Sequence, residues 1–467
     1  MRALAVAVVV ALVLLAVVAL VALDSLEPPP APVVCGSTIT TDTTLSKNIG
    51  PCSGNGLVIG HDGITLDCAG YTISAEYTTN GYANNTGIGI DLTAMKRVTV
   101  KNCDVIGFGY GLVLNGSSSN AIAENVVNGY WAFDLVGSSD NTLTKNTATG
   151  SNGFTLDGSS GNTLIGNKAD GSIIGFMLYG AADNNTLNRN TASNSINTGF
   201  FISSSDSSTL TENTATDSAG YGFYLLNSSK NVITKNTADN NYDGFALSNR
   251  VLEPKRPSVL GPSSSNAFTR NTADNNTHDG FWLSGSPNNT FTTNTVDSNI
   301  NDGFDLYNSS SNAFAGNTAN DNRWYGFDLN DTSDKNTLTA NTANGNGWGF
   351  GLGMSSNNTL VGNTANDNRA ASTNADDGFY LVESSGDTLS GNTANGNFYN
   401  GFYLYKSNSN TLSGNMAGKN GAWGFWLLYS SNDTLTKNMA SEGEGFYVDM
   451  SSSSDRYRVG RYPVGQQ

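Results

Sequence analysis

The sequence has 467 residues, of which 38% are hydrophobic, and its 23 Lys and Arg against 39 Asp and Glu give a formal net charge of −16. A field of this sign repels nucleic acids and other anionic polymers, so nucleic acid is excluded as a partner and an anionic polymer would need a bridging cation. The hydrophobic share is small for a large conventional core. However, Asn, Thr, Ser and 53 Gly recur in a strict period with Phe and Leu, which indicates a repeat protein rather than disorder.

An apolar segment opens the chain. Residues 3–23 contain no charged residue and end before Asp24. Their length fits a membrane-spanning helix, and their position at residues 1–23 fits a secretory signal peptide equally well. Both alternatives place the remaining chain outside the cytoplasm: secreted, periplasmic or anchored to the outer face of the cytoplasmic membrane. Residues 24–34 are rich in Pro and are expected to form a stiff linker.

Four cysteines precede the main repeats, at Cys35, Cys52, Cys68 and Cys103. An even number in an exported chain favours disulfides, for which three pairings exist. We prefer Cys35–Cys52, which closes a short loop, and Cys68–Cys103, which would join matching strands of stacked coils. A zinc site is the weaker alternative because no C-x-x-C spacing occurs. We expect residues 35–110 to form a disulfide-bearing N-terminal cap with the first coils.

Residues 111–450 repeat a unit close to G-F-x-L-x-x-S-S-x-N-T-L-x-x-N-T-A-x-x-N. The unit is too short for a β-α-β crossover and shows no helical period, whereas short strands between Asn, Gly and Ser turns fit a β-helix. The predicted fold is therefore all-β: a right-handed parallel β-helix of about 16 coils. One Asn marks the period: Asn102, Asn125, Asn146, Asn167, Asn190, Asn213, Asn236, Asn271, Asn294, Asn317, Asn341, Asn363, Asn392, Asn415 and Asn438.

Two kinds of interior stack follow from this period. The marker Asn is expected to form an amide ladder, each side chain bonding its counterparts in the coils above and below. Phe and Leu, two residues apart, share the inner face of one strand, and the residue between them faces outward. The predicted interior Phe stack comprises Phe154, Phe176, Phe200, Phe223, Phe245, Phe281, Phe304, Phe327, Phe350, Phe379, Phe402, Phe425 and Phe446.

Two coils are longer than the others, and the pattern stops near the C-terminus. The extra residues 250–257 and 370–375 are expected to be surface loops, and the first of them is the most basic patch within the repeats. Residues 451–467 form a polar tail that we expect to cover the open end of the β-helix.

Three segments, Cys35–Ile39, Gly56–Gly60 and Asp62–Asp67, together with the repeated N-T-x-x-x-N-T-A units, resemble the NosD-type right-handed β-helix family. The resemblance covers about residues 35–450 and implies the pectin-lyase-like fold of the carbohydrate-binding and sugar-hydrolase β-helix group. It also implies periplasmic copper delivery as one function, although fold similarity alone assigns no reaction.

The soft ligands that copper requires are sparse in this chain. The only two His are His61 and His278, which lie several coils apart. Met416 and Met439 occupy one repeat position in adjacent coils, where we interpret them as packing residues. Copper delivery is therefore only the third functional hypothesis.

Aromatic residues recur at the outward position of G-F-x-L and predict a stripe on which sugar rings could stack. The alternatives are that strands simply favour aromatic residues, or that neighbouring rings stack mainly on each other. The candidate substrate-binding residues are Phe201, Tyr224, Trp282, Tyr380, Tyr403 and Trp426, with Tyr447 at the last such position.

Acidic residues gather in the same coils. Asp243, Asp279 and Asp302 precede the Gly of three successive coils, as does Asp377 later, and Asp305 and Asp328 take the outward position in two adjacent coils. Carboxylates one coil apart would be about 5 Å apart, the separation found in retaining glycosidases. Asp279, Asp302, Asp305 and Asp328 are therefore candidate catalytic residues, and Asp243, Asp279 and Asp302 a candidate calcium site. Turn formation by Asp before Gly is the simpler alternative.

The leading hypothesis is an extracytoplasmic, monomeric β-helix protein that binds a carbohydrate or cell-envelope glycan. The sequence leaves open whether it is an enzyme; if it is, a glycoside hydrolase acting on polysaccharide fits best. A lyase fits less well because Lys and Arg are sparse within the coils. The main alternative is a non-enzymatic surface or envelope protein with a structural or protein-binding role.

Overall fold

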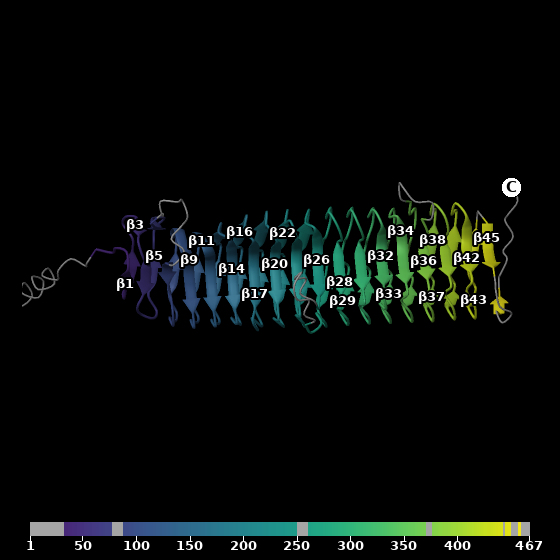
Figure 1. Ribbon diagram of the computed structural model, residues 1–467, viewed down its shortest axis with the longest axis horizontal. Coiled ribbons are helices and arrows are strands. Elements are labelled where there is room, and N and C mark those ends of the chain that lie inside the picture. Colours follow the sequence, from purple (N-terminus) through teal and green to yellow (C-terminus); the bar gives the residue numbers. More distant parts are fainter. Residues whose placement is uncertain are drawn as a thin grey trace, which may run out of the picture. The chain divides into compact units, whose positions relative to one another are not determined.

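The computed structural model describes residues 32–76, 87–249, 260–369, 376–441, 444–449 and 456–458. The chain divides into two units, residues 1–34 and 35–467. Within the described ranges, the second unit consists of strands and turns that form a right-handed parallel β-helix of about 17 turns, which confirms the predicted fold. Figure 1 shows the coils following one another in sequence order. None of the described residues forms a helix long and apolar enough to cross a membrane. The apolar N-terminal segment, both long loops and nearly all of the tail lie outside these residues.

Each coil contributes strands to three parallel sheets, which we name after their inward residues. The Phe sheet carries the G-F-x-L strands, in the order β1 (Ser37–Ile39), β4 (Leu57–Ile59), β7 (Ile88–Asp91), β9 (Asp104–Asn115), β11 (Val126–Val136), β14 (Asn152–Asp157), β17 (Ile174–Tyr179), β20 (Thr198–Ser203), β23 (Tyr221–Leu226), β26 (Asp243–Ser248), β28 (Phe281–Ser284), β30 (Phe304–Tyr307), β32 (Tyr325–Asn330), β34 (Trp348–Gly353), β36 (Phe379–Val382), β39 (Phe402–Tyr405), β42 (Trp423–Leu428) and β45 (Glu444–Asp449).

The Leu sheet carries the N-T-L strands, in the order β2 (Thr43–Thr44), β5 (Thr65–Asp67), β8 (Thr99–Lys101), β10 (Ala121–Ala123), β12 (Thr142–Thr144), β15 (Thr163–Ile165), β18 (Thr186–Asn188), β21 (Thr209–Thr211), β24 (Val232–Thr234), β27 (Ala267–Thr269), β29 (Thr290–Thr292), β31 (Ala313–Ala315), β33 (Thr337–Thr339), β35 (Thr359–Val361), β37 (Thr388–Ser390), β40 (Thr411–Ser413), β43 (Thr434–Thr436) and β46 (Arg456–Arg458).

The Ala sheet is the narrowest. It contains β3 (Ile49–Cys52), β6 (Thr72–Ala75), the first residues of β9 and β11, β13 (Thr147–Ala148), β16 (Lys168–Asp170), β19 (Thr191–Ser193), β22 (Thr214–Thr216), β25 (Thr237–Asp239), β38 (Thr393–Asn395), β41 (Met416–Gly418) and β44 (Met439–Ser441). Between β25 and β38 it continues as single bridges at Thr272, Thr295, Thr318, Thr342 and Thr364.

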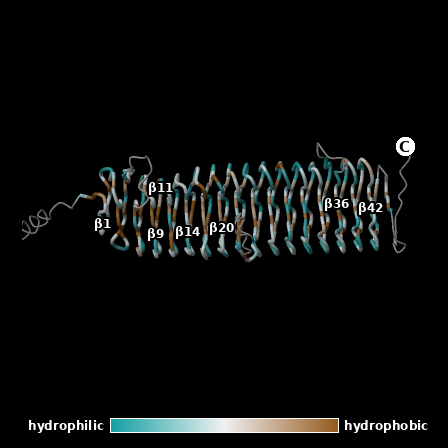
Figure 2. Tube along the Cα trace, in the orientation of Figure 1, coloured by the Kyte–Doolittle hydropathy of each residue, from teal (hydrophilic) through white to brown (hydrophobic). Residues whose placement is uncertain are grey.

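The predicted Phe stack is confirmed along the inner face of the Phe sheet. Successive rings lie 4.6–4.9 Å apart and nearly parallel. The stack begins one coil earlier than predicted, at Phe133. Phe268, Phe291 and Phe314 form a second, shorter stack on the Leu sheet. Apolar and polar segments therefore alternate along each coil (Figure 2).

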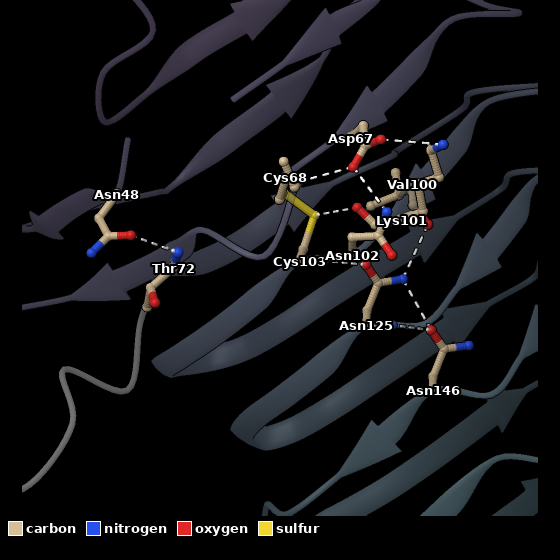
Figure 3. The surroundings of a disulfide bond; sticks show 11 residues. Asn48, Asp67, Cys68, Thr72, Val100, Lys101, Asn102, Cys103, Asn125 and Asn146 are labelled. Carbon is tan, nitrogen blue, oxygen red and sulfur yellow. Dashed lines mark hydrogen bonds and ion pairs between the residues drawn. A yellow bond between two sulfur atoms is a disulfide. The ribbon is translucent and has the colours of Figure 1, made fainter. Parts of the chain in front are cut away.

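The predicted Asn ladder is also confirmed. The Nδ2 group of Asn125 donates to Oδ1 of Asn146 at 3.0 Å, and this bond repeats in the following coils. Asn102, however, is not in the ladder: its position pairs with Glu124, and Cys103 donates its backbone N–H to Asn125 (Figure 3). The Asn of N-T-L and the third Asn of the unit form two further ladders that we did not predict.

Both predicted disulfides are present. Cys35 is bonded to Cys52 and Cys68 to Cys103. Because Cys103 takes the place of the first marker Asn, the second disulfide lies at the head of the amide ladder (Figure 3). The N-terminal coils are thus cross-linked covalently where the ladder begins.

Candidate functional site

The outward residues of the Phe-sheet strands form one column in register, as the period predicted. From β20 to β45, the residues of this column that are neither aromatic nor acidic are Ala246, between Tyr224 and Trp282, and Gly351, between Asp328 and Tyr380. In order, this part of the column runs Phe201, Tyr224, Ala246, Trp282, Asp305, Asp328, Gly351, Tyr380, Tyr403, Trp426 and Tyr447. Two aromatic segments therefore flank a central pair of carboxylates.

The first aromatic segment is packed rather than open. The rings of Phe201 and Tyr224 are 5.5 Å apart, and Tyr221 lies 4.6 Å from Tyr224 and 6.4 Å from Trp282. Tyr224 is buried, and Phe201, Tyr221 and Trp282 pack against it and Leu226. The structure thus supports ring-on-ring packing for these positions, in addition to any role in binding.

The second aromatic segment is more accessible. Tyr380 and Tyr403 are half-buried with ring centres 5.6 Å apart, and Trp426 lies 4.8 Å from Tyr403. Tyr447, at the end of the column, is exposed. Flat side chains at successive coils therefore form a continuous aromatic surface over β36, β39, β42 and β45.

The acids that precede Gly have a structural role. Oδ1 of Asp243 accepts the backbone N–H of Asp279 at 2.9 Å, Oδ1 of Asp279 accepts that of Asp302 at 3.0 Å, and Oδ1 of Asp302 accepts that of Tyr325 at 2.7 Å. Asp377 accepts the N–H of Asn400 in the same way. Each carboxylate thus satisfies a buried donor of the next coil, which supports the turn-forming interpretation for these positions.

His278 joins two of these acids. Its Nδ1 lies 2.9 Å from Asp243 Oδ1 and 3.0 Å from Asp279 Oδ2, and its ring stacks on Tyr242. Hydrogen bonds to the two carboxylates raise the pKa of His278 to about 11. The imidazolium therefore compensates Asp243 and Asp279, and it would have to be displaced before a calcium ion could bind both of them.

Asp302, Asp305 and Asp328 form the second cluster, in which carboxylate oxygens of all three lie within 4.8 Å of one another. Asp302 and Asp328 are buried and Asp305 is half-buried. Burial and the neighbouring carboxylates raise the pKa of Asp302 and of Asp305 well above the ordinary range, and burial raises the pKa of Asp328 to about 7. Asn330 donates a hydrogen bond to Asp328 and favours its ionised form. A carboxyl group whose pKa is raised beside an ionised carboxylate can act as an acid next to a base.

Metal binding would use this second cluster rather than the predicted set. Asp302, Asp305 and Asp328 offer three close carboxylates, whereas Asp243 and Asp279 are bonded to His278. Calcium, which prefers oxygen ligands, fits the second cluster.

Copper fits less well. Met416 and Met439 are paired in register, and 46% and 43% of their surfaces are exposed. Their interpretation as packing residues is therefore wrong. Each Met precedes the inward Ala of its strand and so points outward. All four Cys are in disulfides. In the described part of the chain, two thioethers without a nearby thiol or imidazole do not complete a soft-metal site.

Further acidic and aromatic residues, which were not predicted from the sequence, lie in or beside the column. Asp302 stands directly before a Gly, and Tyr325 and Trp348 occupy the same position in the next two coils. Their ring centres are 4.9 Å apart. Asp134 lies in the outward column of β11, where burial raises its pKa to about 6. Their repeat positions would have identified them, because each matches a position already assigned to the stripe or to the acids.

Comparisons with known proteins agree with this architecture. The family model described as "right handed beta helix region" matches residues 35–192, 86–238, 169–319 and 258–365, and the model described as "periplasmic copper-binding protein (NosD)" matches residues 362–458. A search among curated protein sequences found no match.

Several solved structures are similar in fold. A double mutant of the periplasmic alginate epimerase AlgG is 15% identical, with 70% of this chain and 77% of that chain covered and a TM-score of 0.41. The A-module of the mannuronan C-5 epimerase AlgE4 of Azotobacter vinelandii is 13% identical, with 87% and 91% covered and a TM-score of 0.36. Tailspike protein 3 of bacteriophage CBA120 is 12% identical, with 90% and 56% covered and a TM-score of 0.38. At these identities the similarity concerns the fold alone.

Proposed function

The chain belongs to the right-handed β-helix family, and in this fold the outward side chains of successive coils stand in register. We propose that the protein binds a polysaccharide on the outer face of its Phe sheet and hydrolyses it there. The observation that carries this proposal is the interruption of the aromatic column by Asp305 and Asp328 at adjacent coils. Flat rings suit the apolar faces of sugars, and the paired carboxylates suit cleavage of a glycosidic bond between them.

Hydrogen bonding separates the roles of the two acids. Asp305 lies between Trp282 and Asp328 in the column. Its carboxylate accepts no hydrogen bond from any described residue. Asp305 is therefore the better general acid. Asp328, whose ionised form Asn330 stabilises, is the better nucleophile.

The reaction would then proceed in two steps. Asp305 protonates the glycosidic oxygen while Asp328 attacks the anomeric carbon, which releases one sugar chain and leaves the other as an ester on Asp328. Asp305, now ionised, takes a proton from water, and that water hydrolyses the ester. Because the carboxylates are within 4.8 Å, the anomeric configuration should be retained.

We place this activity outside the cytoplasm. The two disulfides support this location, because such bonds persist in oxidising compartments. The family model that matches residues 362–458 is described as periplasmic, which agrees with it.

The test measures release of reducing ends by the full-length protein from xylan, galactomannan and polygalacturonate. Asp305→Asn and Asp328→Asn should each lower kcat by about 10²–10⁴-fold on the polysaccharide that is cleaved, as expected for loss of a general acid or a nucleophile. Asp134→Asn is the matched control, since Asp134 is also a buried acid of the outward column. The proposal fails if no polysaccharide is cleaved or if Asp305→Asn is as active as the control. Binding without cleavage would favour a non-enzymatic glycan-binding role.

Calcium binding by Asp302, Asp305 and Asp328 is the second candidate, favoured by the closeness of their oxygens. Added calcium should then raise the melting temperature of the wild-type protein but not that of Asp305→Asn. Hydrolysis that persists in the presence of a chelator would separate the two functions.

A further inference from the structure

The outward column of the Phe sheet lacks a side chain at one position, directly beside the acids. Gly351 follows Asp328 in the column. A side-chain carbon placed on Gly351 would lie 2.6 Å from Cε1 of Tyr325 and 3.1 Å from Oδ1 of Asp328. The ring of Tyr325, which belongs to the neighbouring strand β32, therefore fills the space over the glycine. Ring and carboxylate meet above the same residue.

Stacked tryptophans hold this ring in place. Trp348 occupies the position of Tyr325 in the next coil and stacks on it, with ring centres 4.9 Å apart and planes inclined by 20°. Trp348 is buried and stacks in turn on Trp324 at 5.9 Å. The backbone N–H of Tyr325 donates to Oδ1 of Asp302 at 2.7 Å. With one face against Trp348 and one edge against Gly351, the Tyr325 ring is held by shape on two sides.

Tyr325 bounds the acidic part of the column on its C-terminal side. Asp305 and Asp328 lie between Trp282 and Gly351 in successive coils. Because adjacent coils are about 4.8 Å apart, the two acids occupy a short interval that ends at the Trp282 indole on one side and at the Tyr325 ring on the other. A flat ring at this place can contact the apolar face of a sugar unit, and it leaves no room for a substituent that points toward it.

The shape of the Tyr325 side chain, rather than its hydroxyl group, carries this role. Among the described residues, none forms a hydrogen bond with the hydroxyl. The ring alone accounts for the contacts with Trp348 and Gly351. A phenylalanine would therefore make the same boundary.

We propose that Tyr325 is a specificity-determining residue: held over Gly351, its ring admits an unbranched sugar unit beside Asp328 and excludes a unit whose side branch points toward the ring. This inference rests on the proposed function and names its substrate class, a polysaccharide that is unbranched at the cleaved unit. Gly351 is required for it, because any side chain there would push the ring out of place.

The experiment measures kcat/KM of the full-length protein on matched unbranched and branched substrates: xylan and arabinoxylan, mannan and galactomannan, and polygalacturonate and xylogalacturonan. The wild-type protein should prefer the unbranched form by about tenfold or more. Tyr325→Ala should lose this preference by gaining activity on the branched form, whereas Tyr325→Phe, which keeps the ring, should behave as the wild type. Gly351→Ala should lower kcat/KM on the unbranched form by about tenfold or more, because the added methyl group displaces a ring that borders the reacting unit.

Tyr403→Ala is the matched control, since Tyr403 lies two coils beyond Gly351 in the same column. It should weaken cleavage of both forms alike and leave their ratio unchanged. Melting temperatures show whether each variant is folded, and Gly351→Ala tests the ring without removing it.

Equal cleavage of both forms by the wild type overturns the inference, as does a preference that persists in Tyr325→Ala, full activity of Gly351→Ala, or a preference lost in Tyr403→Ala. In each of these cases hydrolysis itself remains, and the proposed function stands. If a polysaccharide is bound but not cleaved, hydrolysis is refuted, and dissociation constants for the two forms decide the inference by the same ratio. If none is bound, the proposed function and this inference both fail.

Discussion

Asp387 occupies a position in the N-T-L ladder that its neighbours fill with Asn358 and Asn410. Its Oδ1 accepts the backbone N–H of Asn358, and its own N–H donates to Oδ1 of Asn410, each at 2.8 Å. Its Oδ2 is buried and has no hydrogen-bond partner among the described residues. An Asn at this position would donate from Nδ2, as Asn358 does to the carbonyl of Ser355, and a carboxyl group can donate only when protonated. Burial, with a contribution from Asp334, raises the pKa of Asp387 to about 7.

Asp387 should therefore contribute to a fall in stability with rising pH, in addition to the other buried carboxyl groups whose pKa is raised. The pKa of Asp387 in the folded state lies above its value of 3.8 in the unfolded chain, so its contribution is intact below pH 3.8 and is lost as the pH rises through about 7. The loss is on the order of 4 kcal/mol at alkaline pH, from about 1.4 kcal/mol per pKa unit. Asp387→Asn should remove this dependence and raise the melting temperature at pH 8.5, while at pH 3.5 the two proteins should melt alike. Equal melting temperatures at both pH values would show that the carboxyl is not protonated in the ladder.

At the scale of single strands, the Phe stack predicts where the core is most sensitive to truncation. Phe304 is fully buried, stacks on Phe281 and Phe327, and meets Phe314 edge-on. Phe304→Ala should cost about 3–5 kcal/mol, measured by denaturant unfolding. Phe446, the half-buried last ring of the stack, stacks on Phe425 and on no other described ring, so its truncation should cost less than half as much. Similar costs at both positions would contradict a core whose strength comes from stacking on both sides.

The repeat period of the sequence predicted the register of the strands well and the roles of individual side chains less well. It placed Asp305 opposite Asp328 and the Phe rings in one stack, because register in a parallel coil depends only on spacing. It misplaced Asn102, since the disulfide cysteine Cys103, one residue on, occupies the ladder position. The bonds of Asp279 to the next coil and to His278 could not be predicted, because they depend on how outward side chains orient around a particular turn.

In the whole β-helix, each coil contacts only its neighbours, so the free energy of unfolding is close to a sum over coils and their interfaces. The terminal coils therefore differ in stability from the central ones. The main Phe stack begins at Phe133, so the described coils before it contribute no ring to that stack. Their strands are instead cross-linked by Cys35–Cys52 and Cys68–Cys103, the second at the head of the amide ladder. The disulfides thus reinforce the coils that have the least aromatic core.

Reduction of the two disulfides should therefore loosen one end of the β-helix. Hydrogen exchange is measured by mass spectrometry under native conditions, with and without a reductant. We expect the reductant to accelerate exchange first in β1–β8. The disulfides close loops with sequence separations of 17 and 35, and each such cross-link contributes about 3 kcal/mol. Exchange in β17–β34 should remain slow, since those coils keep their Phe stack and the ladder of marker Asn residues. Oxidised protein measured without reductant gives the reference exchange rate for each strand. Uniform acceleration along all coils would show that the β-helix unfolds as one cooperative unit, and unchanged exchange in β1–β8 would show that the ladders alone hold the first coils.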